Sequence, residues 1–348
     1  MITRLSVCIP THNRAGLLHQ MLQSLMELRL MPTTNWEIIV VANCCQDDTV
    51  RMANSMAAQL PAPLRVMEEA EPGVVAARNC AVHHARGEII AFLDDDVQVY
   101  PAWLGELIAA FAIKQPDILV GRVLLDWHGL SVPTWFDADM GQYLAEVDLG
   151  DSPLYLQSPL GAAANLAFTR AMLERVGKFR CPLSRHGRRT AGEDTDLIAR
   201  ALRQRSKVLY CPTVAVKHHL APERLTIRYL SRVAHDVGLA EYLIAPPPRF
   251  SQWAWNLAKK TLRFIVRALS WLMVWPWHRR AAARLRVSMA KTRGNIGGLI
   301  WCAVRTIGTC RSHAIMVEDG ISVPTAEIIA DERGIHRQAS ISSPDFPG

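Results

Sequence analysis

The chain has 348 residues, half of them hydrophobic, so it can bury a substantial core; disorder and a small disulfide scaffold are excluded. Its formal net charge of +7 is unevenly distributed. Thirteen Lys and Arg residues and no acidic residue lie between Leu243 and Val317, which leaves 26 basic against 32 acidic residues elsewhere. The sequence therefore describes an acidic body that carries a basic segment.

The eight cysteines are scattered along the chain, and no spacing among them indicates a zinc site. We expect them to be reduced, as in a cytosolic protein. The first residues reach the polar stretch PTHNR too early for the apolar core of a signal peptide. We therefore expect that the protein is not exported.

Short apolar runs alternate with helical periods over the first 220 residues, a pattern typical of βα units around a largely parallel sheet. The expected strands are Leu5–Ile9, Glu37–Val41, Leu64–Met67, Glu88–Leu93 and Lys207–Val216. The expected helices are Leu17–Met26, Asp48–Gln59, Val74–His84 and Trp103–Phe111.

Polar residues follow three of these strands, at Pro10–Arg14, Ala42–Asp48 and Asp94–Asp96. Open parallel sheets bind their ligands beyond the carboxyl ends of the strands. Three consecutive carboxylates repel one another unless water or a cation screens them, and their oxygen atoms suit Mg²⁺ or Mn²⁺. The alternative is a solvated acidic turn that caps the next helix.

Six segments resemble, in order and spacing, the motifs of family 2 glycosyltransferases, over most of residues 4–240. They are VCIPTHNR at 7–14, EIIVVANCCQDDT at 37–49, GVVAARN at 73–79, FLDDDVQVYPAWL at 92–104, the segment 161–177, and GEDTD at 192–196. The resemblance implies an α/β fold of the GT-A type, with a Rossmann-like, mostly parallel sheet flanked by helices. Residues 1–240 would form the catalytic domain, with a nucleotide-binding half at about 1–120 and an acceptor half at 121–240.

The resemblance also implies a nucleotide-sugar donor, a UDP-sugar first of all, and a divalent cation, Mn²⁺ or Mg²⁺, that stabilises the departing diphosphate. Asp94 and Asp96 match the DxD motif, with Asp96 as the direct metal ligand and Asp94 nearer the ribose or a metal-bound water. Asp95 is a helper or merely exposed. His218 would complete the metal shell or contact the diphosphate, with His219 as the weaker alternative.

Further donor-binding residues follow from the same motifs. Arg78 would lie near the diphosphate, or would form a structural salt bridge to an acid of the DxD loop. Ala42 replaces an Asp that is usual in the family, and the neighbouring amide of Asn43 can still bind a base edge. The remaining positions of the donor-binding set are Pro10, Thr11, Asn13 and Arg14.

The GEDTD motif implies the acceptor chemistry. A carboxylate within hydrogen-bond reach of the acceptor hydroxyl can take its proton, and Asp194 matches the family's base. Glu193 would orient the acceptor or the start of the helix. The alternative is that these acids only cap a helix at Asp196–Leu202.

The segment 241–311 lies outside the resemblance, and five of the ten tryptophans lie within its residues 253–277. Its longest apolar run is too short for a membrane span, which needs roughly 20 residues. We expect an interfacial helix with the face Leu257, Thr261, Phe264, Ala268 and Trp271, followed by a basic helix at Arg279–Arg293. Residues 251–305 would bind a membrane surface at its cytoplasmic face. The alternatives are a helical hairpin packed on protein and, least favoured, a nucleic-acid site; we expect no nucleic-acid partner.

Together these features predict an inverting, metal-dependent glycosyltransferase that modifies a hydroxyl acceptor, either lipid-linked or part of a surface glycan, with a mobile tail at 312–348. Inversion follows from the resemblance. One alternative is a sugar nucleotidyltransferase, but no Gly-rich phosphate loop with a Lys follows the first strand. The other is a catalytically inactive nucleotide-binding scaffold at the membrane, which Ala42 favours.

Overall fold

The computed structural model describes residues 4–29, 34–127, 129–161, 164–180 and 192–318, with side chains described as far as residue 304. The chain divides into two compact units, Met1–Ala303 and Val304–Gly348. The first unit contains every strand of the described residues and most of the helices. In the second unit the described residues are helical.

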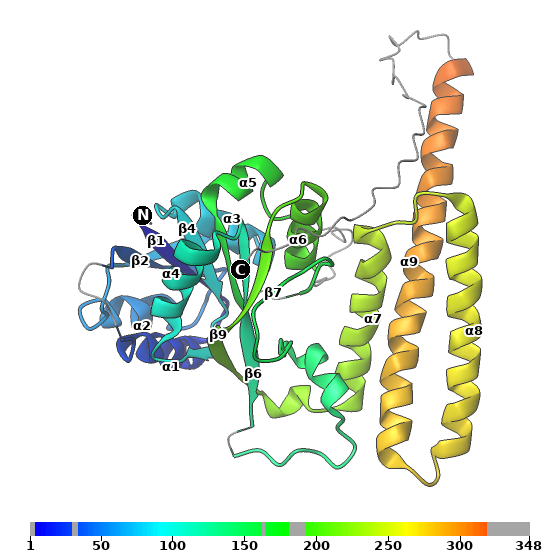
Figure 1. Ribbon diagram of the computed structural model, residues 1–348, viewed down its shortest axis with the longest axis horizontal. Helices are drawn as coiled ribbons and strands as arrows, with labels where there is room; N and C mark the ends of the chain where they lie inside the picture. Colours follow the sequence, from blue (N-terminus) through cyan, green and yellow to red (C-terminus); the bar gives the residue numbers. More distant parts are fainter. Residues whose placement is uncertain (1–3, 30–33, 128, 162–163, 181–191, 319–348) are drawn as a thin grey trace, which may run out of the picture. The chain divides into compact units, whose positions relative to one another are not determined.

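One mixed sheet forms the centre of the first unit (Figure 1). Its strands in the described residues are β1 (Leu5–Thr11), β2 (Trp36–Asn43), β3 (Leu64–Glu69), β4 (Ile89–Leu93), β5 (Val97–Val99), β6 (Ile118–Asp126), β7 (Leu154–Tyr155), β8 (Asn165–Thr169) and β9 (Val208–His219). The order is β3-β2-β1-β4-β8-β6-β9-β5, with β7 paired to β9. The strands β3, β2, β1 and β4 are parallel to one another, and β8 is antiparallel to both of its neighbours.

Helices flank the sheet and continue beyond it. The α-helices are α1 (Ala15–Met26), α2 (Thr49–Met56), α3 (Val74–His84), α4 (Trp103–Lys114), α5 (Arg170–Val176), α6 (Glu193–Arg203), α7 (Ile227–Ile244), α8 (Phe250–Val274) and α9 (Arg279–Glu318), and the short 3₁₀ helices are η1 (Ala138–Leu144) and η2 (Pro222–Arg224). Threonines begin two of them, since Thr169 accepts a hydrogen bond from Met172 N and Thr226 accepts one from Tyr229 N, both at 3.2 Å.

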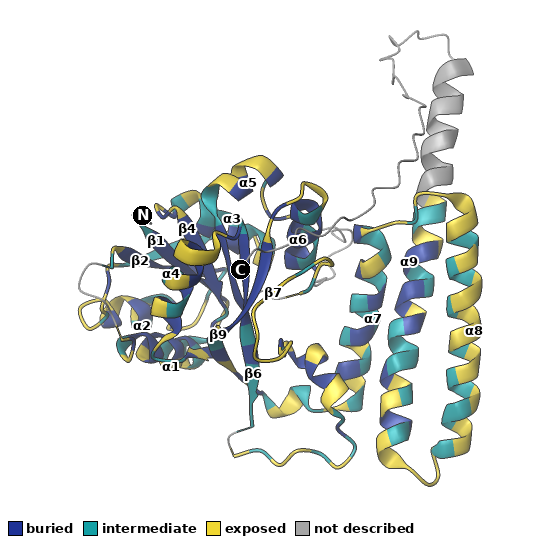
Figure 2. Cartoon of the chain, in the orientation of Figure 1, coloured by how far each residue is buried: buried dark blue, intermediate teal, exposed yellow. Residues whose placement is uncertain are grey.

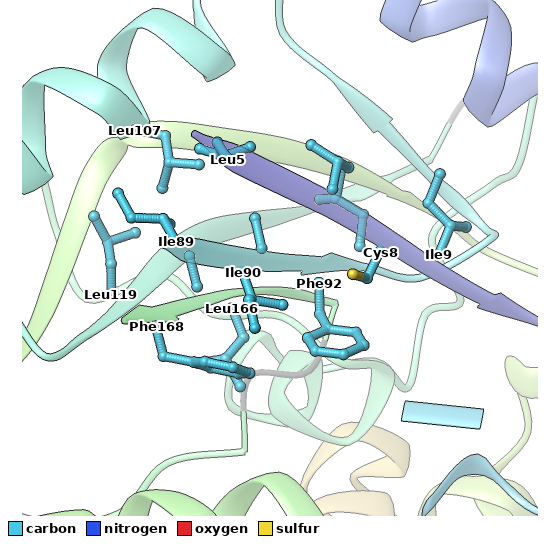
Figure 3. Close-up of a cluster of buried hydrophobic side chains, with 14 of the residues drawn as sticks. Leu5, Cys8, Ile9, Ile89, Ile90, Phe92, Leu107, Leu119, Leu166 and Phe168 are labelled. Carbon is cyan, nitrogen blue, oxygen red and sulfur yellow. The ribbon is translucent and has the colours of Figure 1, made fainter. Parts of the chain in front are cut away.

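The core lies on both faces of the sheet. All eight residues of β2 are buried, as expected for a strand covered by helices on each side. α1 buries the stripe Leu18, Met21, Leu22 and Leu25 at helical spacing. Figure 3 shows Cys8 of β1 and Phe92 of β4 among the buried side chains between the layers. The predicted α/β fold, a mostly parallel sheet flanked by helices, is confirmed.

Several element boundaries differ from the predicted ones. The helix expected at Asp48–Gln59 is α2, which ends at Met56, and α4 continues three residues past Phe111 to a left-handed Gln115, with φ of 47°. The basic helix expected at Arg279–Arg293 is the longer α9, which runs on to Glu318. The first residues of the tail expected at 312–348 are therefore helical, and 319–348 lie outside the described residues.

The strand order contains a switch point between β1 and β4. β1 pairs with β2 on one side and with β4 on the other, so the chain turns in opposite directions after β1 and after β4. Such a switch point leaves a crevice at the carboxyl ends of the strands, where doubly wound sheets bind their ligands. The segments 10–14 and 94–96 both begin there.

α7 and α9 pack backbone to backbone (Figure 1). A Cβ added to Gly238 of α7 would lie 2.1 Å from the Lys291 carbonyl oxygen, and one added to Gly294 of α9 would lie 2.0 Å from the His235 carbonyl oxygen. Next to this contact the buried Asn295 donates from Nδ2 to the Gly238 carbonyl and to Glu241 Oε2, both at 2.8 Å. Glycine is therefore required on both helices for this close approach.

Gly294→Ala is expected to lower the free energy of unfolding by about 1–3 kcal/mol, because the new methyl group forces α7 and α9 apart. Gly297→Ala on the same helix is the matched control, since its Cβ would meet Leu239 Cδ1 at an ordinary 3.7 Å. Higher helix propensity should make that variant more stable by about 0.5–1 kcal/mol. Urea unfolding checks both; an equal response of the two variants would contradict the close packing of α7 and α9.

α8 has two apolar faces, of which one packs on protein (Figure 2). Trp253 Nε1 donates to the Leu299 carbonyl and Lys260 Nζ donates to Asn295 Oδ1, both at 2.8 Å, so this side meets α9. Leu257, Phe264, Ala268 and Trp271 of the face predicted to bind lipid are half-buried. That prediction is corrected: the large exposed side chains of α8 form the outer face, with Trp255, Leu262, Ile265, Val266, Leu269, Leu272 and Met273. No helix in the described ranges is both long and apolar enough to cross a membrane.

Candidate active site

The loops after β1 and β4 meet in the crevice through a buried carboxylate. Asp95, only 4% exposed, accepts a hydrogen bond from Thr11 Oγ1 at 2.7 Å and an ion-paired one from Arg14 Nη1 at 2.8 Å. Burial raises the pKa of Asp95, although Arg14 and the Thr11 hydroxyl act in the opposite direction. Asp95 is thus a buried anchor for Thr11 and Arg14, and the exposed alternative is excluded.

Asp96 lies between three positively polarised groups. Its Oδ1 is 3.3 Å from His218 Nε2, and its Oδ2 lies 3.2 Å from both Arg14 Nη1 and Arg224 Nη2. Burial opposes ionisation, but His218 and the two guanidinium groups outweigh it and hold the pKa of Asp96 well below its usual range. Asp96 is therefore a carboxylate at neutral pH.

Arg78 joins the DxD loop to the GEDTD segment. Its Nη2 lies 3.5 Å from Asp94 Oδ1, and its Nη1 forms an ion-paired hydrogen bond to Glu193 Oε1. The guanidinium also stacks over the Phe179 ring, 5.7 Å from its centre, and Arg78 as a whole is 3% exposed. The salt bridge to an acid of the DxD loop, one of the two roles considered for Arg78, is thus present.

The two acids beside Arg78 hold protons more tightly than usual. Burial in the crevice and the adjacent carboxylates raise the pKa of Asp94 to about 6, against the lowering effect of Arg78. Burial likewise raises the pKa of Glu193. Glu193 Oε2 is buried and has no hydrogen-bond partner among the described residues. This oxygen is therefore a place where a hydroxyl group of a ligand could bind.

Asp194 stands in the first turn of α6, next to Glu193. It is 7% exposed, and its Oδ1 accepts from Thr195 N at 2.7 Å and from Thr195 Oγ1 at 3.3 Å. A Cβ on Gly161 would approach Asp194 Oδ2 to 3.6 Å, so the absence of a side chain there leaves space beside the carboxylate. Helix α6 starts at Glu193, three residues earlier than the predicted cap helix.

The other residues predicted to bind the donor contact neighbouring loops. Asn43 Nδ2 donates to the Glu69 and Glu71 carbonyls at 3.2 and 2.7 Å, and its Oδ1 accepts from Gly73 N at 2.8 Å. Its amide therefore holds the loop before α3, which leaves no amide hydrogen for a base. Asn13, exposed and left-handed with φ of 51°, accepts from Gln46 N at 2.7 Å, and Pro10 is half-buried in β1.

The predicted metal ligands are only partly brought together. Asp96 and His218 are in contact, whereas Asp94 faces Arg78. Among the described residues no group of three or more His, Cys, Asp and Glu side chains is arranged to hold a metal ion. Two protein ligands still suit Mg²⁺ or Mn²⁺ when substrate phosphates and water complete the shell. His219, on the opposite face of β9, is exposed.

Sequence reasoning missed two residues of this region. Arg224 of η2 reaches Asp96, although only its position six residues after His218 could have indicated it. Asp47 accepts hydrogen bonds from Ala15 N at 3.2 Å and Thr49 N at 3.1 Å and so ties the start of α1 to that of α2. The bond from the Thr49 hydroxyl lowers the pKa of Asp47.

Comparison with known proteins agrees with this architecture. Residues 6–138 match the family model described as Glycosyl transferase family 2. Glycosyltransferase AglE of Haloferax volcanii is 29% identical over 118 residues, which make up 34% of this chain and 38% of that protein. Succinoglycan biosynthesis protein ExoM of Rhizobium meliloti is 22% identical over 245 residues, 69% of this chain and 75% of that protein.

A solved structure is similar over most of the chain. The mannosyltransferase PcManGT from Pyrobaculum calidifontis, in complex with GDP-Man and Mn²⁺, superposes with a TM-score of 0.53 at 18% identity and covers 90% of this chain and 79% of that one. The fold is therefore of the GT-A glycosyltransferase type. The resemblance to family 2 glycosyltransferases is confirmed by the family model over residues 6–138, and the match to AglE spans 38% of that protein's length.

Proposed function

We propose that this protein is a glycosyltransferase that moves a sugar from a nucleotide-sugar donor to a hydroxyl acceptor in the synthesis of a cell-surface glycan. One observation carries the proposal: Arg78, 3% exposed, bridges Asp94 of the DxD loop and Glu193 of the GEDTD segment. Arg78 is thus a buried cation that contacts both the motif proposed to bind the donor and the motif proposed to bind the acceptor. The name of ExoM, a succinoglycan biosynthesis protein, supports the glycan assignment.

The crevice offers the groups that a nucleoside diphosphate requires. Arg14 and Arg224 lie at Asp96, and Arg78 lies at Asp94, so three guanidinium groups surround the place where the diphosphate would bind. Thr11 is at the end of β1 in the same crevice. A UDP-sugar is the first donor to test. The role proposed for Asn43 is to hold the loop before α3 and not to read the base.

A divalent cation fits the pair formed by Asp96 and His218. Asp96 Oδ1 and His218 Nε2 are 3.3 Å apart, a separation at which both atoms can ligate one ion with bonds of about 2.0–2.2 Å. Asp94 would hold a water of that ion or the ribose. A cation bound there would neutralise the charge that grows on the leaving diphosphate. Arg14 and Arg224 both contact Asp96. When a diphosphate binds, they could release this carboxylate and bind phosphate oxygens instead.

The transfer itself is proposed to be a single displacement with inversion. Asp194 accepts the proton of the acceptor hydroxyl while that oxygen attacks the anomeric carbon, and the bond from this carbon to the diphosphate oxygen breaks. The unpartnered Glu193 Oε2 accepts a hydrogen bond from a hydroxyl of the incoming acceptor. Arg78 counteracts the effect of burial on the pKa of Glu193 and holds its side chain in place.

Peripheral attachment to the cytoplasmic face of a membrane, through residues 251–305, completes the proposal. The outer face of α8 exposes Trp255 by 68% and Met273 by 77%, in a segment without acidic residues. An apolar face beside basic residues is the pattern of a helix that lies in the lipid interface. The acceptor is accordingly proposed to be lipid-linked.

The donor site is tested by thermal stabilisation of the purified protein with UDP, GDP, CMP and dTDP compounds, with and without Mn²⁺. One nucleotide should raise the stability by about 2.7 kcal/mol at 100 times its dissociation constant, and only with the metal. Asp96→Asn should abolish the shift. Asp48→Asn, which changes an exposed acid paired with Arg51, should leave it intact. The absence of a shift for every nucleotide would contradict the donor site, and binding without turnover would favour the scaffold.

A further inference from the structure

A cavity of about 360 Å³ lies between α7, α8 and α9, apart from the crevice of the sheet. Its floor is apolar and half-buried, with Phe264 from α8 and Met289 and Ala290 from α9. Its exposed rim carries three guanidinium groups, Arg232 from α7 and Arg286 and Arg293 from α9. An apolar floor below a cationic rim fits an amphiphile with an anionic head.

The positive charge at the rim is not neutralised by protein. None of the three arginines has a carboxylate within 4.0 Å in the described part of the chain, whereas Arg284, two residues before Arg286, pairs with Asp139 at 2.9 Å. The nearby acid Asp236 contacts His235 Nδ1 at 3.2 Å. Arg286 and Arg293 are two helical turns apart and so lie on one side of α9. They can bind two oxygens of one group from neighbouring positions.

A buried hydroxyl in the cavity lacks a partner. Ser231 lines the cavity, and its Oγ is inaccessible to solvent and makes no hydrogen bond within the described residues. A buried donor without an acceptor costs free energy, so such groups indicate a missing ligand or water. If the Ser231 side chain turns toward the cavity, an acceptor oxygen on an anionic ligand would satisfy this hydroxyl together with the guanidinium groups.

The cavity lies at the depth that lipid headgroups would reach. Phe264 contributes to it from the packed side of α8, and the opposite side of the same helix is the exposed apolar face. A helix with its side chains is about 10–12 Å thick. When the outer face rests at the acyl boundary, the packed side of α8 therefore lies in the headgroup layer.

We propose that this cavity binds the phosphate of an anionic membrane lipid, with Arg286 and Arg293 forming charge-assisted hydrogen bonds to the phosphate oxygens and Arg232 adding charge at the rim. Phe264 and Met289 contact the apolar part of the lipid next to its headgroup. This inference rests on the proposed membrane attachment. It adds a specific site for a lipid headgroup to the general affinity of α8 for the membrane surface. It is independent of the donor crevice.

Sedimentation of the full chain with vesicles tests the site, using neutral phosphatidylcholine alone or mixed with phosphatidic acid. The wild type should bind the anionic vesicles more tightly. Arg286→Lys with Arg293→Lys retains the charge but loses the planar fork, and should weaken this binding about tenfold. The matched control is Arg263→Lys with Arg279→Lys, two exposed positions outside the cavity, which should bind like the wild type.

Each other outcome overturns the proposal in a recognisable way. Equal binding by both double variants would mean diffuse attraction between charges, and equal binding to neutral vesicles would mean that the phosphate headgroup is not recognised. Release of the protein by an excess of inorganic phosphate over vesicle phosphate, with matching thermal stabilisation, would assign the cavity to free phosphate. No nucleotide sugar is present in these assays, so failure of the donor site would leave their result unchanged.

Discussion

Asp194→Asn is expected to lower kcat about 10²–10⁴-fold, the usual contribution of a general base. Asparagine retains the shape of the side chain and an Oδ1 that can accept the 2.7 Å hydrogen bond from Thr195 N, so the start of α6 should remain intact. The amide cannot take a proton from the acceptor hydroxyl. Thermal stabilisation by the donor nucleotide should therefore stay unchanged while turnover at saturating donor falls.

Asp196→Asn is the matched control within the same motif. Asp196 pairs with Arg200 at 2.8 Å, and Arg200 donates to the Val176 and Lys178 carbonyls, so this acid has a structural role. The control is expected to be less stable but to retain kcat at a temperature where it is folded. If both variants lost turnover equally, or Asp194→Asn kept wild-type turnover, Asp194 would not be the base.

The elements that surround the crevice could be predicted because their burial follows simple periods. β2 is hydrophobic almost throughout, as a strand covered on both faces must be, and α1 repeats its apolar residues at helical spacing. The polar segments follow β1 and β4 directly in the sequence. They could therefore also be predicted to lie at the carboxyl ends of these strands. The topology then brought Thr11 and Arg14 to Asp95.

The pairing of charges within the site could not be predicted from the sequence. Arg78 and Glu193 are 115 residues apart, and every acid of the DxD loop was an equally good partner for Arg78. Arg224 had no motif of its own, although it is one of the cations that keep Asp96 ionised. The amide of Asn43 is engaged by three backbone groups that no local pattern reveals.

The face of α8 that was predicted to bind lipid packs on α9 instead, for a physical reason. The helix repeats apolar residues at helical spacing on two sides, one through Leu257, Phe264 and Trp271 and the other through Trp255, Leu262 and Leu269. Periodicity identifies both stripes but not which of them meets α9. The packed side depends on polar groups of α9, because Asn295 and Leu299 bind Lys260 and Trp253 on the first side of α8.

Arg78→Ala is expected to lower the free energy of unfolding by about 3–5 kcal/mol, because it removes one partner of a buried ion pair. An ionised Glu193, 6% exposed, would then have neither the guanidinium nor water to stabilise its charge. Burial already raises the pKa of Glu193 against the effect of Arg78, so loss of the cation should raise it further and favour the protonated acid. Urea unfolding measures the loss.

A second substitution separates charge compensation from packing. Glu193→Gln in the Arg78→Ala background removes the uncompensated charge, so the double variant should recover part of the lost stability. Arg51→Ala is the control for an exposed pair: Arg51 and Asp48 are in contact at 2.6 Å on the surface, and its unfolding midpoint should not change measurably. If Glu193→Gln brought no recovery, the loss would come from the contact between Arg78 and the Phe179 ring, and the pair with Glu193 would not stabilise the fold.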